Sequence, residues 1–346
     1  MLMLSRLTLF LIISLPLISV AEESAVEAAH SQGEFIGAKE TVYPDWFKAS
    51  FMELAEDVQE AASEGKRVML FFHQDGCPYC NLMVERNLSQ KDIAETMQAK
   101  LDVIEINMWG DREVGAVNGK TYTEKAFAEA LKVQFTPTLL FLDESGRVVL
   151  RLNGYIPPHN FKVALDYVNS HKEKESSYRK YLAKRQPPPA AGELHSESFF
   201  IKPPYDLSKG KRPVALFFEQ QQCPNCDKLH KEVLTDSGIR QLVSRFDAVQ
   251  LDIWSDTPVV TPTGKRVTAR AWARELQINF APSVVLIDRQ HGEVIRSEAV
   301  FKRFHTESIF DYLLSGGFQH QPSFQRYITE RAEGIREQGR DVDLWK

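Results

Sequence analysis

Val68–Cys80 reads VMLFFHQDGCPYC, and Val214–Cys226 reads VALFFEQQQCPNC, so one pattern occurs twice in this chain. In each copy an apolar run typical of a buried strand leads directly into two cysteines separated by two residues. Such a motif, placed where a strand runs into a helix, is the local signature of a thiol–disulfide site. The two motifs contain all the cysteines of the chain, which are Cys77, Cys80, Cys223 and Cys226.

The similarity between the two copies extends far beyond the cysteines. Asp102–Asp111 (DVIEINMWGD) matches Asp247–Asp256 (DAVQLDIWSD) at an offset of 145 residues, and Tyr178–Arg185 (YRKYLAKR) matches Phe324–Arg331 (FQRYITER) at 146. Single-residue insertions or deletions explain the change of offset between 146 and 145. Because this period is far above the roughly 20–50 residues of solenoid repeats, the repeated unit is a domain.

The duplication and two composition breaks predict the domain organisation. The stretch Gln186–Glu193 (QPPPAAGE) contains three consecutive prolines, which cannot continue a helix and favour an extended connection. We therefore expect a signal peptide at residues 1–21, a first domain at 22–186, a Pro-rich linker at 187–198 and a second domain at 199–346.

The first 21 residues have the composition of a secretory signal peptide. Arg6 ends a short basic region, an apolar run extends from Leu7 to Val20, and Ser19-x-Ala21 provides small residues for cleavage. The run is shorter than the roughly 20 residues of a spanning helix and contains Pro16. We expect export to the periplasm, with secretion as the alternative, and no integral membrane protein after cleavage. An uncleaved anchor is the competing interpretation.

Composition narrows the class of protein. Apolar residues make up 43% and charged residues 26% of the chain, as in ordinary soluble globular proteins. The net charge of −5, without a basic stripe, argues against a nucleic-acid partner.

The order of predicted elements in the first copy indicates the fold. Apolar residues from Phe47 through Phe51 to Ala62 fall at helical spacing, and Gly65 ends that helix. The second copy lacks a convincing helix before Val214. A βαβ unit followed by a β-hairpin and a helix is the order of the thioredoxin fold, with a central mixed sheet flanked by helices. The remaining predicted elements of the first copy are strands 68–72, 103–106, 139–142 and 147–152 and helices at 124–131 and from about 160.

The motifs together resemble a known family. The FF-x-Q-x-x-CP-x-C stretch, the Trp-x-Asp after the third strand, a following Gly-Lys and an x-Pro loop are similar to SoxW-type periplasmic thioredoxin-like proteins. The first copy resembles them over Tyr43–Val168, and the second, more loosely, over Arg212–Leu314. The resemblance implies an α/β protein with two tandem thioredoxin-like domains.

The resemblance also assigns a role to two X-Pro pairs. Thr136-Pro137 and Ala281-Pro282 follow the cysteines by about sixty residues. They resemble the cis-proline that faces the cysteines in thioredoxin-fold proteins, although only about 5–6% of X-Pro bonds are cis in general. In that family the backbone before the proline pairs with an incoming peptide. We therefore expect all four residues to bind substrate.

The spacing of the cysteines predicts distinct roles within each pair. A helix N-terminus favours the thiolate, so Cys77 and Cys223 are the expected nucleophiles and should be exposed. Cys80 and Cys226, one turn further along, would resolve a mixed disulfide. Two structural disulfides are one alternative. A Cys₄ zinc site is the other, but the 142 residues between the pairs argue against it. We expect no cofactor and no metal.

The chain departs from thioredoxins where a buried aspartate handles protons, six residues before the first cysteine. Phe71 and Phe217 stand there instead. His73 and Glu219, four residues before each first cysteine, are alternative proton carriers, although we expect His73 to be a solvated surface residue. The central Pro-Tyr resembles glutaredoxins and some disulfide isomerases more than thioredoxin.

Two further features have a plain and a functional interpretation. Trp109 and Trp254 recur before an acidic residue at the end of the third strand, either as rim aromatics over the core or as peptide contacts. The basic segment Lys172–Arg185 predicts a solvated helix face, with docking to a partner as the alternative.

These observations predict an exported thiol–disulfide oxidoreductase with two sites. It would reduce or exchange disulfides in protein substrates, and the resemblance implies a membrane electron donor. A disulfide oxidase or isomerase is one alternative. A non-catalytic thioredoxin-fold chaperone or metal-binding module is the other.

Overall fold

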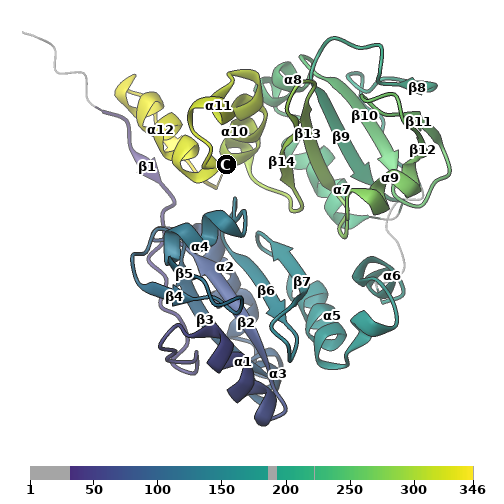
Figure 1. The fold of residues 1–346 in the computed structure, drawn as a ribbon. Helices are drawn as coiled ribbons and strands as arrows, with labels where there is room; N and C mark the ends of the chain where they lie inside the picture. Colours follow the sequence, from purple (N-terminus) through teal and green to yellow (C-terminus); the bar gives the residue numbers. More distant parts are fainter. Residues whose placement is uncertain (1–31, 186–192, 222, 346) are drawn as a thin grey trace, which may run out of the picture.

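The computed structural model describes residues 32–185, 193–221 and 223–345 (Figure 1). The predicted signal peptide and residues 187–192 of the predicted linker lie outside the described residues. Across the described part of the chain, no helix combines the length and apolarity that spanning a membrane requires.

The first repeat is built on a four-stranded sheet with the order β3-β2-β6-β7. β2 runs parallel to β3 and antiparallel to β6, which pairs antiparallel with β7, so the sheet is mixed as predicted. Its strands are β2 (Arg67–His73), β3 (Leu101–Asn107), β6 (Thr138–Leu142) and β7 (Val148–Asn153), with a side hairpin of β4 (Glu113–Gly115) and β5 (Thr121–Thr123). Its helices are α1 (Leu54–Ser63), α2 (Pro78–Met83), the π-helix η1 (Val84–Leu88), α3 (Lys91–Lys100), α4 (Glu124–Ala130), α5 (Pro158–Asn169), the 3₁₀ turn η2 (Lys172–Lys174) and α6 (Tyr178–Ala183).

Both faces of this sheet are buried because strand residues alternate between two apolar layers. Leu70 and Phe72 of β2 pack with helices α1 and α4 on one face. Met69 and Phe71 pack with α2, α3 and α5 on the other face. The cysteine-bearing helix α2 is therefore held on the second face.

The second repeat has the same topology, with the sheet order β10-β9-β13-β14. β9 is parallel to β10 and antiparallel to β13. Its strands are β8 (Tyr205–Asp206), β9 (Val214–Glu219), β10 (Asp247–Asp252), β11 (Pro258–Val260), β12 (Arg266–Thr268), β13 (Ser283–Asp288) and β14 (Gly292–Ser297). Its helices are α7 (Pro224–Lys228), the π-helix η3 (Leu229–Val233), α8 (Ser237–Val243), α9 (Ala269–Glu275), α10 (Arg303–Leu314), α11 (Gly317–His320) and α12 (Phe324–Glu337).

The start of the first helix was predicted wrongly. α1 begins at Leu54, and Phe51 is 98% exposed. Met52 has a left-handed φ of 66°, and its N–H bonds to Ser50 Oγ, so the chain turns sharply where the apolar spacing predicted helix. The absence of a first helix in the second repeat is confirmed for the described residues 193–213, where strand β8 stands instead.

The basic segment Lys172–Arg185 was also predicted wrongly as one helix with a solvated face. It divides into η2 and α6, and His171 before η2 is left-handed with a φ of 54°. Tyr178, Arg179 and Leu182 of α6 are buried. The reason is long-range: α6 packs against the second repeat, as described below.

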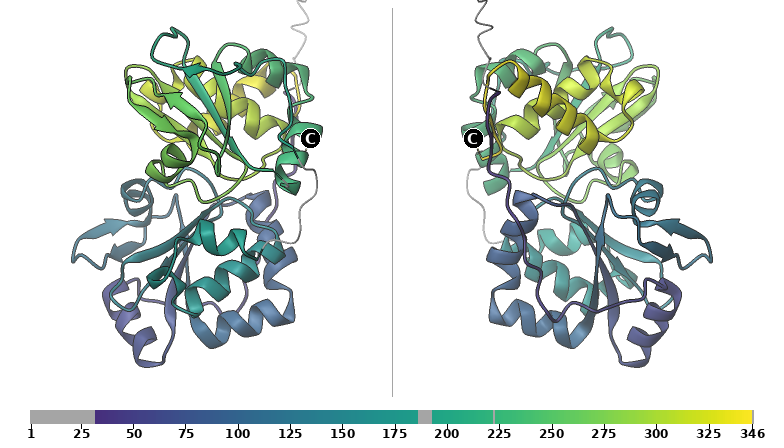
Figure 2. Two further views of the ribbon diagram at one scale, coloured as in Figure 1. Left: turned by 90° about the vertical axis from the view of Figure 1, so that its right-hand side faces the viewer. Right: turned by 90° about the vertical axis from the view of Figure 1, so that its left-hand side faces the viewer.

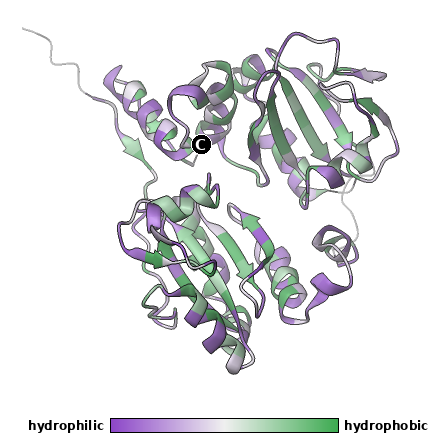
Figure 3. Cartoon of the chain, viewed as in Figure 1, coloured by the Kyte–Doolittle hydropathy of each residue, from purple (hydrophilic) through white to green (hydrophobic). Residues whose placement is uncertain are grey.

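The two repeats contact each other through equivalent positions. Asn153 Nδ2 donates to Glu298 Oε2 at 2.6 Å, and these residues correspond at the ends of β7 and β14. Their neighbours Gly154 and Ala299 also correspond, and a Cβ built on Gly154 would lie 3.1 Å from that of Ala299. One hydrophobic cluster runs through both repeats, including Phe135 and Phe301. Figure 2 shows the repeats stacked, and Figure 3 shows their apolar central strands.

The two ends of the described chain also meet. β1 (Phe35–Ile36) pairs in parallel with β15 (Val342–Asp343), which follows α12 (Figure 1). Beyond β1, Lys39 N–H donates to Gly76 O in the loop before the first cysteine. The N-terminal segment therefore joins the last helix of the second repeat to the cysteine loop of the first.

A pair of glycine substitutions tests the contact between the repeats. Gly119 and Gly154 have nearly equal φ values of 78° and 79°, but only Gly154 faces the other repeat, while a Cβ on Gly119 would meet nothing within 4 Å. We expect Gly119→Ala to lower the free energy of unfolding by about 1 kcal/mol through backbone strain. Gly154→Ala should lower it by about 2–3 kcal/mol, because overpacking against Ala299 and Phe301 adds to that strain.

Urea unfolding of the two variants measures this difference, with Gly119→Ala as the matched control. Equal losses would contradict the contact of Gly154 with Ala299 and Phe301.

Candidate active sites

The first cysteine pair lies between β2 and α2. Cys77 is the N-cap of α2, and its Sγ accepts a hydrogen bond from the Cys80 N–H at 3.0 Å. Pro78 takes the first helical position, where a missing N–H costs the helix nothing. Cys77 and Cys80 form a disulfide. The Thr136-Pro137 bond is cis, as predicted, and Thr136 Oγ1 donates to Cys77 Sγ at 3.3 Å.

The second pair repeats this geometry. Cys223 caps α7 and accepts the Cys226 N–H at 3.0 Å, and the two cysteines form a disulfide. The Ala281-Pro282 bond is also cis, and Cys223 Sγ lies 3.5 Å from Ala281 O. The structure therefore brings together all four predicted residues of each site.

The expected exposure of the first cysteines is wrong. Cys77 is 2% exposed and Cys223 is 6% exposed. The sequence placed both at the rim of an isolated domain, where the helix N-terminus faces solvent. In the folded chain each rim is covered by the other repeat.

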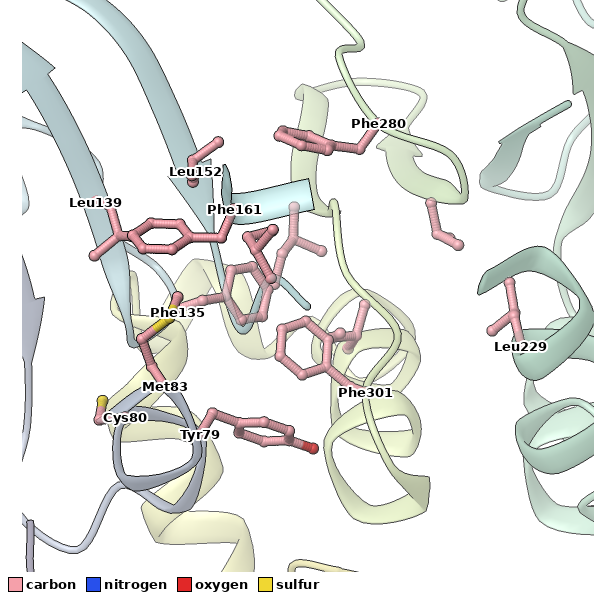
Figure 4. Close-up of a cluster of buried hydrophobic side chains, with 14 of the residues drawn as sticks. Tyr79, Cys80, Met83, Phe135, Leu139, Leu152, Phe161, Leu229, Phe280 and Phe301 are labelled. Atoms are coloured by element: carbon pink, nitrogen blue, oxygen red, sulfur yellow. The ribbon is translucent and has the colours of Figure 1, made fainter. Parts of the chain in front are cut away.

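Aromatic side chains fill the surface around the first pair. Tyr79, between the cysteines, packs edge-on against Phe301, and its hydroxyl accepts the Lys302 N–H at 3.1 Å. Phe135, which precedes the cis-proline dipeptide, stacks on Phe301 with ring centroids 5.0 Å apart. Trp345 closes the group from the end of the chain, 5.7 Å from the Tyr79 ring. Figure 4 shows Tyr79 and Phe135 pointing toward Phe301.

Around the second pair the corresponding side chains are smaller and leave a cavity of about 70 Å³ between the repeats. Asn225 takes the place of Tyr79, and Ile156 takes the place of Phe301. Glu298 lines the cavity, and burial raises the pKa of its carboxyl above the ordinary value. The wall includes Tyr155, Ile156 and Asn160 of the first repeat and Asn225, Pro282 and Glu298 of the second.

Each site has a tryptophan–glutamine pair at its edge. Trp109 Nε1 donates to Gln74 Oε1 at 2.9 Å, and Trp254 Nε1 donates to Gln220 Oε1 at 3.0 Å. The other repeat covers both indoles, with the Arg326 guanidinium 5.3 Å from the Trp109 ring and that of Arg179 4.7 Å from the Trp254 ring. Both tryptophans therefore lie at a rim that faces the other repeat, and a contact with a peptide substrate stays a prediction.

His73 is buried, not solvated as expected. Its Nε2 pairs with Glu105, and its ring packs against Tyr43. The hydrogen bond from His73, followed by the charges of His73 and Arg112, lowers the pKa of the Glu105 carboxyl. The first repeat thus keeps an acid–base pair on β2 and β3, formed by the buried His73 and the half-buried Glu105, although Phe71 occupies the position of the missing aspartate.

Glu219, the equivalent of His73, is fully buried and pairs with His230 Nε2 at 3.0 Å. Glu197 lies 3.0 Å from the other ring nitrogen, so both nitrogens donate only when the ring is protonated. Burial acts to lower the pKa of His230, but Glu219 and then Glu197 raise it above the ordinary value. Gln250 Nε2 donates to Glu219 as well.

Sequence reasoning missed the residues that cover the sites. Tyr178 packs against Phe280 with centroids 5.6 Å apart, and Phe324 packs against Phe135 at 5.3 Å. These contacts correspond to each other in the two repeats. The matching tails YRKYLAKR and FQRYITER were the available signal, because they repeat outside the minimal thioredoxin fold.

Several solved structures resemble parts of this chain. A thioredoxin-fold protein from Helicobacter pylori is 23% identical, with a TM-score of 0.31, over 39% of this chain and 90% of that one. A thioredoxin from Thermus thermophilus is 25% identical, with a TM-score of 0.27, over 38% and 88%. The oxidised C-terminal domain of DsbD from Neisseria meningitidis is 18% identical, with a TM-score of 0.26, over 38% and 99%. No curated protein matches the chain.

The sequence model of the thioredoxin-like domain matches twice, at residues 54–169 and 207–305, which together exceed half of the chain. Both matches include a cysteine pair and its cis-proline. The chain therefore belongs to the thioredoxin-like domain family and carries two copies of that domain.

Proposed function

We propose that the protein is an exported thiol–disulfide oxidoreductase with one redox-active cysteine pair in each repeat. The observation that carries this proposal is the repeated geometry at the first cysteine. Its sulfur caps a helix and lies within 3.5 Å of the residue before a cis-proline, Thr136 in one repeat and Ala281 in the other.

The proposed reaction follows from the order of the cysteines. In the reduced form, the Cys77 thiolate attacks a substrate disulfide, forms a mixed disulfide and releases one substrate thiolate. The Cys80 thiolate then attacks the Cys77 sulfur and releases the second substrate thiolate. Two electrons pass to the substrate, and the Cys77–Cys80 disulfide remains. Cys223 and Cys226 would act in the same way, and Thr136, Pro137, Ala281 and Pro282 would hold the substrate backbone.

The direction of the reaction and the partner are further parts of the proposal. The SoxW-type resemblance favours a periplasmic reductase that acts on protein disulfides and is itself reduced by a membrane electron donor. The predicted signal peptide supports export, with secretion as the alternative. A disulfide oxidase or isomerase uses the same geometry in the other direction or without net electron transfer.

We also propose that His230 and Glu219 handle protons for the second pair. Phe217 occupies the position of the missing aspartate, and Glu219 lies two residues further along the same strand. His230 lies one helical turn after Cys226 and is itself buried. Glu219 on β9 and His230 on η3 thus form a buried acid–base pair on the two elements that flank these cysteines.

Serine substitutions test the redox function. We expect the variant Cys77→Ser/Cys223→Ser to reduce insulin no faster than the uncatalysed reaction, because neither repeat keeps its nucleophile. Each single variant should retain the activity of the other pair. A double variant that still catalyses the reaction would sink the proposal, and suppression of aggregation by a cysteine-free variant would favour the chaperone alternative.

The reduction potential of each pair tests the direction. A reductase should have values nearer to the roughly −270 mV of thioredoxin than to the roughly −120 mV of a strong oxidant. The single serine variants isolate the pairs for equilibration with glutathione. Values between about −120 and −200 mV would overturn the proposed direction and favour oxidation or isomerisation.

The pH dependence of stability tests the charged state of His230. A raised pKa means that protonation stabilises the folded state, so this contribution is complete below about pH 6.5 and is lost as the pH rises through the folded value. We expect the melting temperature to fall less steeply above neutral pH in His230→Gln than in the unmodified protein. The exposed His320→Gln variant is the control, and parallel profiles for all three proteins would contradict the assignment.

A further inference from the structure

We propose that the last helix of each repeat caps the redox site of the other repeat, so that the resting protein excludes protein-sized partners from both disulfides. This inference rests on the proposed function only in naming the excluded partners. Its evidence is the reciprocal position of helices α6 and α12.

Helix α12 of the second repeat occupies the edge of the first site. Phe324 packs on Phe135, beside the cis-proline loop. Gln325 donates from Nε2 to Gln134 O at 2.9 Å and accepts from Gln74 Nε2 at 3.0 Å. Both hydrogen bonds of Gln325 therefore end on the first repeat, and one of them reaches the glutamine that holds Trp109.

Helix α6 of the first repeat occupies the same place at the second site. Tyr178 packs on Phe280, and the Arg179 guanidinium lies over Trp254 and donates to Ile253 O at 3.4 Å. Tyr178 and Arg179 correspond in the repeat to Phe324 and Gln325. Equivalent residues thus make equivalent contacts across the interface, in both directions.

The caps cover the groove that a peptide substrate would need. A client backbone must lie beside the residue before the cis-proline while its sulfur reaches the first cysteine. At 2% and 6% exposure, Cys77 and Cys223 offer no such approach. The caps must move, or the repeats must separate, before a folded protein can exchange disulfides with either pair.

The closure is tighter at the first site. Tyr79, Phe301 and Trp345 fill the space there, and β1 and β15 hold the end of the chain against the cysteine loop. The second site retains the cavity of about 70 Å³ beside Asn225 and Pro282. The rates at which a small reductant reduces the two disulfides should therefore differ less than the rates at which a protein reductant reduces them.

The experiment compares two reductants on one-pair proteins. The variant Cys223→Ser/Cys226→Ser keeps the first disulfide, and Cys77→Ser/Cys80→Ser keeps the second. Reduced thioredoxin is the protein probe and donates two electrons as its own dithiol becomes a disulfide. A water-soluble phosphine is the small probe, which water converts to phosphine oxide as two thiols form. The readout is the rate constant for reduction by thioredoxin divided by the rate constant for reduction by the phosphine. Neither measurement requires turnover by this protein.

The expected pattern is crossed. Gln325→Ala, on the second repeat, should raise the ratio at Cys77–Cys80 about tenfold, equivalent to about 1.4 kcal/mol. Arg179→Ala, on the first repeat, should raise the ratio at Cys223–Cys226 to a similar extent. The exposed residues Lys180 and Thr329 on the same helices provide matched alanine controls, which should leave both ratios unchanged.

Acceleration of the opposite pair, alone or together with the pair of the same repeat, supports the caps. Unchanged ratios in both variants, or acceleration confined to the pair in the substituted repeat, would overturn the inference. If an alanine variant does not fold, Gln325→Glu and Arg179→Gln replace it, since each removes a bond to the other repeat and keeps the side-chain length or polarity. A protein without insulin reductase activity would still give a clear result, so the two proposals fail separately.

Discussion

The packing of Tyr178 on Phe280 and of Phe324 on Phe135 is the contact on which the arrangement of this molecule depends. Tyr178 and Phe324 each belong to the last helix of one repeat, and each packs on a ring beside the cis-proline of the other repeat. Burial of these rings joins the apolar layers on the cysteine sides of both sheets into one cluster. The opposite layers, behind α1 and α4 in one repeat and α9 in the other, remain separate. The two domains are thus independent on one face and share a core on the other.

Much of the fold and of the site chemistry could be predicted from local patterns. The apolar strand before each cysteine pair and the hairpin after the cis-proline are confirmed, because short-range sequence patterns determine them. The two cis bonds, which the family resemblance implied, are confirmed as well. The same reasoning wrongly placed Phe51 in the first helix, because the left-handed conformation of Met52 interrupts the chain before that helix begins. The burial of Cys77 and Cys223 could not be predicted, because the side chains that cover each site belong to the other repeat, as the contacts of Gln325 with Gln74 and of Arg179 with Ile253 show.

The sites differ although their frames agree. His73 pairs with Glu105 in the first repeat, whereas the equivalent positions hold Glu219 and Gln250, and His230 supplies the base. Each repeat therefore contains a carboxylate paired with an imidazole, but the imidazole comes from strand β2 in the first repeat and from helix η3 in the second. The packing beside the cysteines differs between the repeats: aromatic side chains fill the space at the first site, whereas a cavity lies at the second. Charge chemistry is thus kept while packing is relaxed.

The meeting of Asn153 with Glu298 and of Gly154 with Ala299 gives the molecule the geometry of an isologous dimer whose two subunits share one chain. In a true homodimer, any substitution near the axis appears on both sides at once. Here the amide and the carboxyl that face each other are already different residues, a pairing that identical subunits cannot make. Covalent linkage therefore frees the two redox centres to diverge in ligand size and acid–base chemistry while each remains dependent on the other for its cover.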